Sequence, residues 1–220
     1  MRISHRFQFI FLAYPRTASS SIRRILDSYS DVEGVHLEEV TVSNPFHHHM
    51  NAQEACSNFN NLGWDWSAYE SFCLVRNPYH RLASLFWRRT EARHLRDARL
   101  NKLSLGYSNL LAVLPPKAGF LMYVLTRRTN TGVSQSLEAF TQDLNGHSLV
   151  STILKFENLD VELPQFLESI GITISSDEIP HLNARQEQIA FAELYLPLTA
   201  AIIKKKYQTT IREYGYEVVF

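Results

Sequence analysis

Two stretches of the chain begin with apolar residues, turn polar and then open a helix: Phe9-Ile-Phe-Leu-Ala-Tyr-Pro-Arg-Thr-Ala-Ser-Ser-Ser21 and Phe72-Cys-Leu-Val-Arg-Asn-Pro-Tyr-His-Arg-Leu-Ala-Ser84. Backbone N–H groups at the beginning of a helix attract anions, because the helix dipole places partial positive charge there. The first stretch adds several hydroxyl side chains to such a turn, and the second places Arg76 where its apolar run ends. We therefore expect the two turns to bind one ligand that carries phosphate-like groups at two separated points.

Short apolar runs alternate with segments of helical periodicity along most of the chain. This alternation is typical of an α/β three-layer fold with a central, mainly parallel sheet, in which ligands bind beyond the carboxyl ends of the strands. We interpret residues 1–220 as a single domain and expect residues 98–135 to be irregular. The expected strands are Phe7–Ala13, Val35–Val42, Ser71–Val75 and Val150–Phe156; the expected helices are Ser20–Ser30, one between Asn51 and Gly63, one beginning at Pro78, Leu137–Leu144, Pro164–Ile170 and Pro197–Glu213.

The composition excludes some classes of function. The 220 residues carry no net charge at pH 7, which disfavours a globally basic nucleic-acid-binding protein. No apolar run approaches the roughly 18 residues that indicate a membrane span, and no leader pattern opens the chain. Cys56 and Cys73 could pair in principle, but two cysteines do not indicate a disulfide framework. We therefore expect a cytoplasmic protein without a membrane span and without a nucleic-acid partner.

The first turn differs from a Walker-type phosphate loop, G-x-x-x-x-G-K-[ST], because it has no glycine and has Arg16 where a lysine is expected. Arg16 can still pair bidentately with an anion, while Ser19, Ser20 and Ser21 supply hydroxyl and N–H donors. Taken alone, this turn is equally compatible with an ordinary capped start of a helix.

The second turn shifts the balance towards an anion-binding site. A P-loop enzyme that uses ATP needs an acidic residue on a neighbouring strand to hold magnesium, whereas this strand end carries Arg76. A cation at that point suits a phosphate and repels a metal ion, so we expect no metal. The alternative for Arg76 is an ion pair with a structural carboxylate.

With these two motifs, the chain resembles the sulfotransferases that use 3′-phosphoadenosine 5′-phosphosulfate, and in particular their carbohydrate branch. The turn from Tyr14 to Ser21 resembles the 5′-phosphosulfate loop of this family, and Val75-Arg-Asn-Pro-Tyr-His-Arg-Leu-Ala-Ser84 resembles its 3′-phosphate motif. Leu154-Lys-Phe-Glu-Asn-Leu159, Pro180-His-Leu-Asn183 and Tyr214-Gly-Tyr216 are also similar to that branch. The departures are Arg16 for the usual lysine and Ser19 where a glycine is common.

The resemblance implies a P-loop-like fold and the transfer of a sulfonyl group to a hydroxyl of a carbohydrate or glycoconjugate. It implies 3′-phosphoadenosine 5′-phosphosulfate as the co-substrate. It also implies that Asn183 and Arg185 lie in a loop that closes over the nucleotide. The residues implied to hold the 5′ side are Arg16, Thr17, Ala18, Ser19, Ser20 and Ser21, and those implied to hold the 3′-phosphate are Arg76 and Ser84. Arg16 would also stabilise the charge that grows on the bridging oxygen.

The acceptor hydroxyl needs a general base, and the segment His49-Met-Asn-Ala-Gln-Glu54 resembles the histidine-bearing segment of the carbohydrate branch. We therefore expect His49 to be the base, with His47 as a second participant, because a neutral imidazole accepts a proton near pH 7. Exposed or capping histidines are the alternative. Glu54 is a weaker candidate, since its spacing from Asn51 already predicts a capping box. The run His47-His-His49 also suggests zinc, but consecutive residues rarely converge on one metal ion.

Two other functions fit parts of these patterns. One is a P-loop kinase that acts on small molecules with ATP and magnesium, and the other is a non-catalytic nucleotide-binding protein of the same fold.

Overall fold

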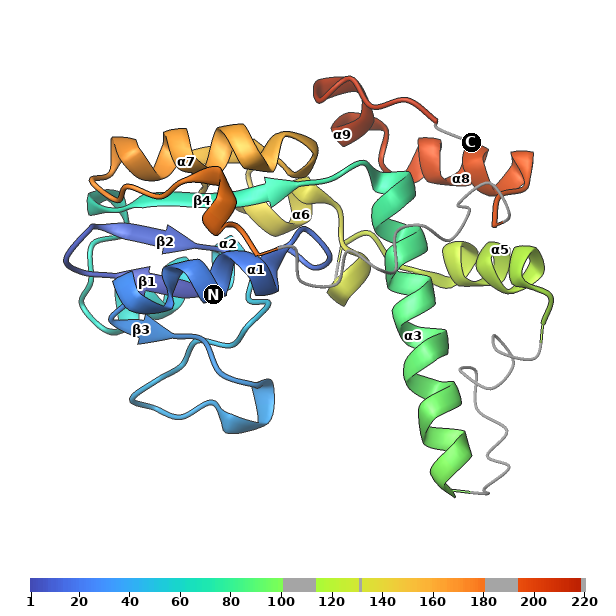
Figure 1. Cartoon of the computed structure of the whole chain (residues 1–220), viewed down its shortest axis with the longest axis horizontal. Helices are drawn as coiled ribbons and strands as arrows, with labels where there is room; N and C mark the ends of the chain where they lie inside the picture. Colours follow the sequence, from blue (N-terminus) through green and yellow to red (C-terminus); the bar gives the residue numbers. More distant parts are fainter. Residues whose placement is uncertain (101–113, 131, 181–193, 219–220) are drawn as a thin grey trace. The chain divides into compact units, whose positions relative to one another are not determined.

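The computed structural model describes residues 1–100, 114–130, 132–180 and 194–218, with only the helical backbone described for residues 91–100. The chain forms two compact units (Figure 1). The first consists of Met1–Arg76 and Leu137–Leu182, and the second of Asn77–Ser136 and Asn183–Phe220. Within the described ranges, no helix combines the length and the apolar character needed to cross a membrane.

The first unit contains a five-stranded mixed sheet with the order β3-β1-β2-β4-β5. Strands β2, β4 and β5 are parallel, whereas β1 runs antiparallel to both β2 and β3. Phe11 of β2 lies opposite Phe72 of β4, so the two strands end at the same edge of the sheet. The strands are β1 Arg2–Ser4, β2 Phe9–Phe11, β3 Val32–Glu33, β4 Glu70–Val75 and β5 Thr152–Lys155.

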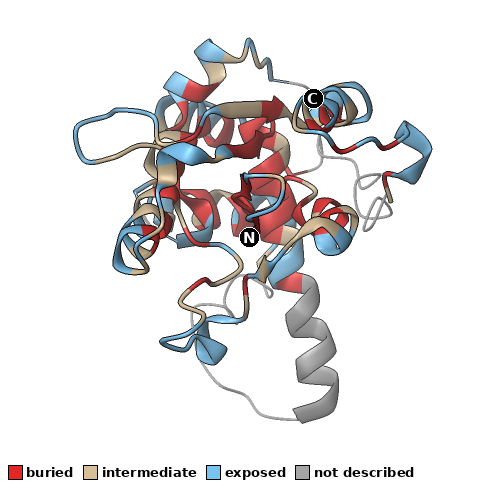
Figure 2. Cartoon of the chain, turned by 90° about the vertical axis from the view of Figure 1, so that its left-hand side faces the viewer, coloured by how far each residue is buried: buried red, intermediate tan, exposed pale blue. Residues whose placement is uncertain are grey.

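Helices cover the sheet of the first unit. Phe11 and Leu74 belong to an apolar cluster with residues of α1 (Ser19–Leu26) and α7 (Leu159–Ser169). Residues of the opposite strand face, such as Ile10 and Cys73, are also completely buried (Figure 2). Helices α2 (Ala52–Asn61) and α6 (Leu137–Thr141) pack against each other and lie outside that cluster. The predicted α/β fold with a parallel core is therefore confirmed, with β1 and β3 as an antiparallel extension.

The second unit is helical and has its own core. Its helices are α3 (Pro78–Leu100), α5 (Pro116–Thr126), α8 (Pro197–Lys206) and α9 (Gln208–Glu213). Helix α3 begins at Pro78 as predicted, and the side-chain oxygen of Asn77 caps it by accepting a hydrogen bond from the backbone N–H of Tyr79 at 3.0 Å. The ammonium of Lys206 donates to the carbonyls of Val124 and Arg127 at 2.6 and 2.8 Å and thereby caps the end of α5.

Several short 3₁₀ helices connect these elements: η1 Asp27–Tyr29, η2 Leu37–Glu39, η3 Trp66–Ala68, η4 Gly132–Ser134, η5 Phe156–Asn158 and η6 Ser176–Glu178. One of them overturns a prediction, because residues 35–42 form η2 and extended loop rather than a strand. Leu37, Val40 and Val42 are all exposed, and Val42 is 96% exposed. The strand of this region is the two-residue β3.

Some helices also differ from the prediction, and one observed helix was not predicted. The helix expected over Pro197–Glu213 is interrupted at Tyr207, whose φ of −122° and ψ of 28° are not helical. Helix α7 begins at Leu159 and contains Pro164 in its interior, so the expected start at Pro164 is wrong. Residues 116–126, expected to be irregular, form α5 with a proline at its first position, which suits a helix start.

Candidate functional site

The loop between β2 and α1 contains two residues with left-handed backbone. Arg16 has a φ of 70° and Ala18 has a φ of 58°, although neither is a glycine. A side chain in this conformation costs about 1–2 kcal/mol, which indicates that the surrounding contacts impose the turn. One such contact is the hydrogen bond from the Thr17 hydroxyl to the carbonyl of Tyr14 at 2.8 Å. The positions in this loop whose backbone favours glycine are therefore Arg16 and Ala18. Ser19, which stands where a glycine is common in the family that the chain resembles, is the first residue of α1.

The start of α1 presents N–H groups in the way the sequence predicts. The backbone N–H of Ile22 donates to the carbonyl of Ala18, so the N–H groups of Ser19, Ser20 and Ser21 precede this first helical hydrogen bond. The hydroxyls differ in exposure: Ser20 is exposed, whereas Ser19 and Ser21 are nearly buried. Because the Thr17 hydroxyl points into the loop, Thr17 can offer a ligand its backbone N–H rather than its side chain.

Arg76 brings the second motif to this loop. It directly follows β4, is only 4% exposed, and donates a hydrogen bond from Nη1 to the carbonyl of Arg16 at 3.2 Å. Its guanidinium lies over the ring of Phe156, with 4.3 Å between the guanidinium carbon and the ring centroid. Cation–π contact with an aromatic face favours an arginine held in one orientation. The two cationic turns predicted from the sequence therefore meet at one edge of the sheet.

The remaining residues expected around the donor lie elsewhere in the chain. Ser84 is a nearly buried residue of α3 in the second unit, eight positions after Arg76. Asn183 and Arg185 lie outside the described residues.

His49 contacts the same loop through its imidazole. Its Nδ1 lies 2.8 Å from the carbonyl oxygen of Ala13, the second residue after β2. A carbonyl oxygen only accepts hydrogen bonds, so Nδ1 must carry the proton and Nε2 of the neutral ring has the lone pair. His49 is exposed as a whole residue, yet the partial burial of its ring lowers its pKa below the usual 6.5, with the positive charge of Arg23 among the further causes. The ring is therefore neutral at pH 7, with Nε2 able to accept a proton.

The two neighbouring histidines contact different groups. Nε2 of His47 lies 3.8 Å from a carboxylate oxygen of Glu54, and burial lowers the pKa of His47. The ring of His48 meets that of His36 edge-on at 4.8 Å between centroids. Burial and the nearby Arg23 lower the pKa of His48 to about 4. The three side chains thus have separate partners and do not converge on one point.

Glu54 has the capping role that its spacing predicts. The side-chain oxygen of Asn51 accepts a hydrogen bond from the backbone N–H of Glu54 at 2.8 Å, and the Glu54 carboxylate accepts one in return from the Asn51 N–H. This reciprocal pair fixes the start of α2 directly after the histidine segment.

Two residues of the site were not singled out from the sequence. Phe156 supports Arg76, and the only signal for it was its place in the segment Leu154–Leu159. Arg23 is half-buried on α1, where burial lowers its pKa, and its charge reaches both His48 and His49. The carboxylates near Arg23 form their ion pairs with Arg2, at 2.6 Å for Asp27 and 3.0 Å for Glu33.

The family model described as the sulfotransferase family matches residues 1–217. No curated protein matches the chain. A solved structure, that of mouse sulfotransferase SULT7A1 complexed with PAP, is similar with a TM-score of 0.51 and 14% sequence identity; the match covers 96% of this chain and 86% of that one. At this identity the structural match supports the fold.

Proposed function

The chain belongs to the sulfotransferase family, and we propose that it transfers a sulfonyl group from 3′-phosphoadenosine 5′-phosphosulfate to a hydroxyl of a carbohydrate or glycoconjugate. The observation that carries this proposal is the hydrogen bond between Arg76 and the carbonyl of Arg16. It brings together two cationic turns, and the co-substrate has anionic groups on both its 5′ and 3′ sides. The PAP bound to the similar mouse sulfotransferase is consistent with this donor.

The donor's 5′ side is proposed to bind the loop from Arg16 to Ser21, and its 3′-phosphate to bind Arg76 and Ser84. The N–H groups at the start of α1 and the exposed hydroxyl of Ser20 suit a phosphosulfate. The buried guanidinium of Arg76, flat against Phe156, suits a phosphate that is recognised by two parallel hydrogen bonds.

In the proposed reaction, Nε2 of His49 takes the proton of the acceptor hydroxyl while its oxygen forms a bond to the sulfur atom. The bond between sulfur and the bridging phosphate oxygen breaks on the opposite side, and 3′-phosphoadenosine 5′-phosphate leaves. Negative charge grows on the bridging oxygen, where Arg16 and the N–H groups of α1 would stabilise it. The Nδ1 hydrogen bond to Ala13 supports the role of His49, because it leaves Nε2 as the proton acceptor.

His47 is proposed as a second participant that acts on the acceptor side. Its pKa is lowered by burial, so it is also neutral at pH 7, and its Nε2 lies 3.8 Å from the Glu54 carboxylate.

A thermal-shift comparison tests the choice of donor. We expect 3′-phosphoadenosine 5′-phosphate without magnesium to raise the unfolding temperature, because binding to the folded state stabilises it. ATP with magnesium should have a smaller effect, since Arg76 occupies the strand end where a magnesium-dependent enzyme places a carboxylate. Stabilisation by ATP with magnesium, but not by 3′-phosphoadenosine 5′-phosphate, would favour the kinase instead. Tight binding of the bisphosphate without transfer of labelled sulfate to any glycan of a panel would favour a non-catalytic nucleotide-binding protein.

A further inference from the structure

Arg23 lies on the side of α1 that faces the beginning of β1. Asp27, four positions later and directly after α1, forms an ion pair with Arg2 of β1 at 2.6 Å. Residues four positions apart share one face of a helix, so Arg23 and Asp27 point towards the same strand. The Arg23 side chain is half-buried there, and its Nε donates a hydrogen bond to the carbonyl of Ser19 at 3.3 Å.

The histidine segment lies against the same end of β1. The Met1 amine donates a hydrogen bond to the carbonyl of His48 at 3.0 Å, and the N–H of His48 donates to the carbonyl of Val35 at 2.9 Å. These contacts place His48 and His49 close to the strand that Arg23 faces. All of these residues belong to the first unit, so the arrangement does not involve the second.

The charge of Arg23 is not neutralised by a carboxylate. Among the residues that the structure describes, Arg23 forms no ion pair. The two carboxylates near it, Asp27 and Glu33, are paired with Arg2 at 2.6 and 3.0 Å. A guanidinium does not lose its proton in a protein, so Arg23 keeps its positive charge at every pH at which the chain is folded.

The His49 ring is surrounded by groups of unequal charge. Besides Arg23, the groups that face it are the Met1 amine and the His47 ring. Burial holds the pKa of the Met1 amine well below its usual 8.0, and burial also lowers the pKa of His47. The charge of both groups near pH 7 is therefore reduced, whereas that of Arg23 is constant. The carbonyl of Ala13 acts in the opposite direction, because its hydrogen bond favours the protonated ring.

We propose that Arg23 is a positioning residue for sulfonyl transfer, whose fixed charge keeps the His49 ring unprotonated and extends the action of this base into the acid range. The proposal rests on the proposed function, in which Nε2 of His49 accepts the proton of the acceptor hydroxyl. A protonated imidazole has no lone pair to accept that proton. Because a nearby positive charge disfavours a second one, removal of the Arg23 charge should make His49 easier to protonate.

The test follows the protonation of His49 by nuclear magnetic resonance of the full chain with labelled imidazoles, from about pH 4.5 to about pH 8. The signal of His49 is the one that His49→Gln removes. We expect Arg23→Gln to raise the titration midpoint of His49 by about 0.5–1 pH unit. Arg23→Lys keeps the charge and should titrate like the unmodified chain.

The rate of transfer gives a second readout. In single-turnover assays, the acid limb of the pH profile should move to higher pH in Arg23→Gln, so that this variant is about 3–10-fold slower on that limb. The rate above about pH 7.5 should be unchanged, because His49 is neutral there in both proteins. A purely structural role of Arg23 would lower the rate at every pH and leave the limb in place.

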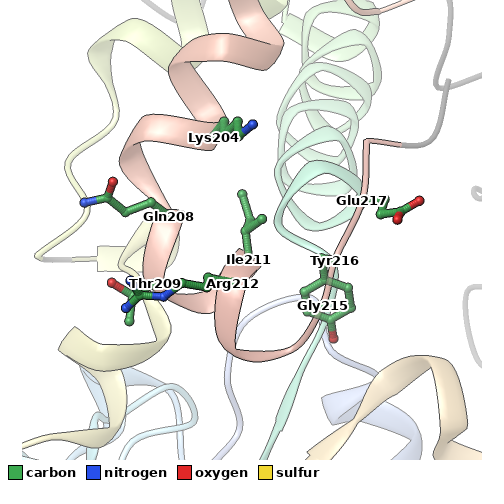
Figure 3. Close-up of a pocket in the computed structure, with 8 residues that line it drawn as sticks. All are labelled: Lys204, Gln208, Thr209, Ile211, Arg212, Gly215, Tyr216 and Glu217. Atoms are coloured by element: carbon green, nitrogen blue, oxygen red, sulfur yellow. The ribbon is translucent and has the colours of Figure 1, made fainter.

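Two exposed arginines provide matched controls. Arg24 is the next residue of α1. Arg212 belongs to the second unit and lines a pocket of ≈ 590 Å³ beside α8 and α9, to which no described residue of the donor site or of the histidine segment contributes (Figure 3). Arg24→Gln and Arg212→Gln each remove one positive charge and should leave the titration of His49 unchanged, because exposed charges are screened.

A His49 midpoint that Arg23→Gln does not raise would overturn the proposal. So would an equal rise in Arg23→Lys or in either control. Unfolding temperatures of the variants show that they remain folded. Failure of the proposed function appears separately, as an absence of sulfonyl transfer by the unmodified chain, because the titration needs neither donor nor acceptor.

Discussion

The guanidinium of Arg76 donates a hydrogen bond to the backbone carbonyl of Arg16 across 60 positions of the chain. This contact orients the Arg76 side chain and fixes the loop after β2 against the residue that directly follows β4. A buried guanidinium held against this loop favours a site that binds an anion, because a buried cation is costly without a negative partner. Changes at Arg76 or in this loop should therefore alter nucleotide affinity or the free energy of unfolding.

Replacement of Arg76 by lysine should weaken the binding of 3′-phosphoadenosine 5′-phosphate by about tenfold or more. Lysine keeps the charge, but it lacks the planar fork that lies over Phe156 and reaches Arg16. Isothermal titration calorimetry measures the change. Arg24→Lys on the exposed side of α1 is the control and should bind like the unmodified chain. An affinity that Arg76→Lys leaves unaltered would contradict the role of the guanidinium.

Replacement of Ala18 by glycine should raise the free energy of unfolding by about 1 kcal/mol. Glycine relieves the left-handed backbone at a φ of 58°, and this gain exceeds the entropy lost on ordering a glycine. Urea unfolding gives the value. Ala201→Gly, at an exposed position inside α8, should change stability in the opposite direction by about 1 kcal/mol. Destabilisation by both changes would show that the loop is not strained at Ala18.

Replacement of His49 by alanine should reduce sulfonyl transfer by about 100-fold or more while donor affinity stays the same, as expected when a general base is removed. Burial lowers the pKa of His49, so transfer by the unmodified enzyme should persist below pH 6.5. Single-turnover assays across pH measure the rate of sulfonyl transfer, and calorimetry measures the affinity for the donor. His147→Ala, at an exposed turn, is the control. Transfer near the normal rate would remove His49 from the mechanism.

The free energy of unfolding should depend on pH through His48, the residue before His49. The folded pKa of His48 is about 4, whereas an unfolded histidine titrates near 6.5. The unfolded state therefore binds more protons between these values, and the free energy of unfolding should fall as the pH decreases from about 6.5 towards 4. Urea unfolding of the unmodified chain and of His48→Gln measures this. A pH dependence of the same slope in both proteins would show that His48 does not contribute.

The features predicted correctly from the sequence depend on local patterns. The two turns can be predicted because each follows a short apolar run and precedes a segment with helical periodicity. The capping box of α2 follows from the spacing of Asn51 and Glu54 alone. The adjacency of Arg16 and Arg76 could also be predicted, since parallel neighbouring strands end at one edge of a sheet.

What the sequence could not show depends on contacts between distant residues. The proton position on His49 follows from a carbonyl 36 residues away, and the left-handed backbone at Ala18 contradicts the usual preference for glycine. The alternation around Val42 resembles a strand, yet Val42 belongs to none of the five strands of the described sheet. Helix α5 has no distinct polar face that would mark it in the sequence, because apolar residues such as Leu125, which is 55% exposed, also stand on its outer side.

A crystal structure of the chain with 3′-phosphoadenosine 5′-phosphate tests the central claim most directly. We predict one nucleotide whose 5′-phosphate accepts hydrogen bonds from the loop between Arg16 and Ser21 and whose 3′-phosphate accepts one from Arg76. Electron density for the nucleotide at any site that does not touch both arginines would contradict the account.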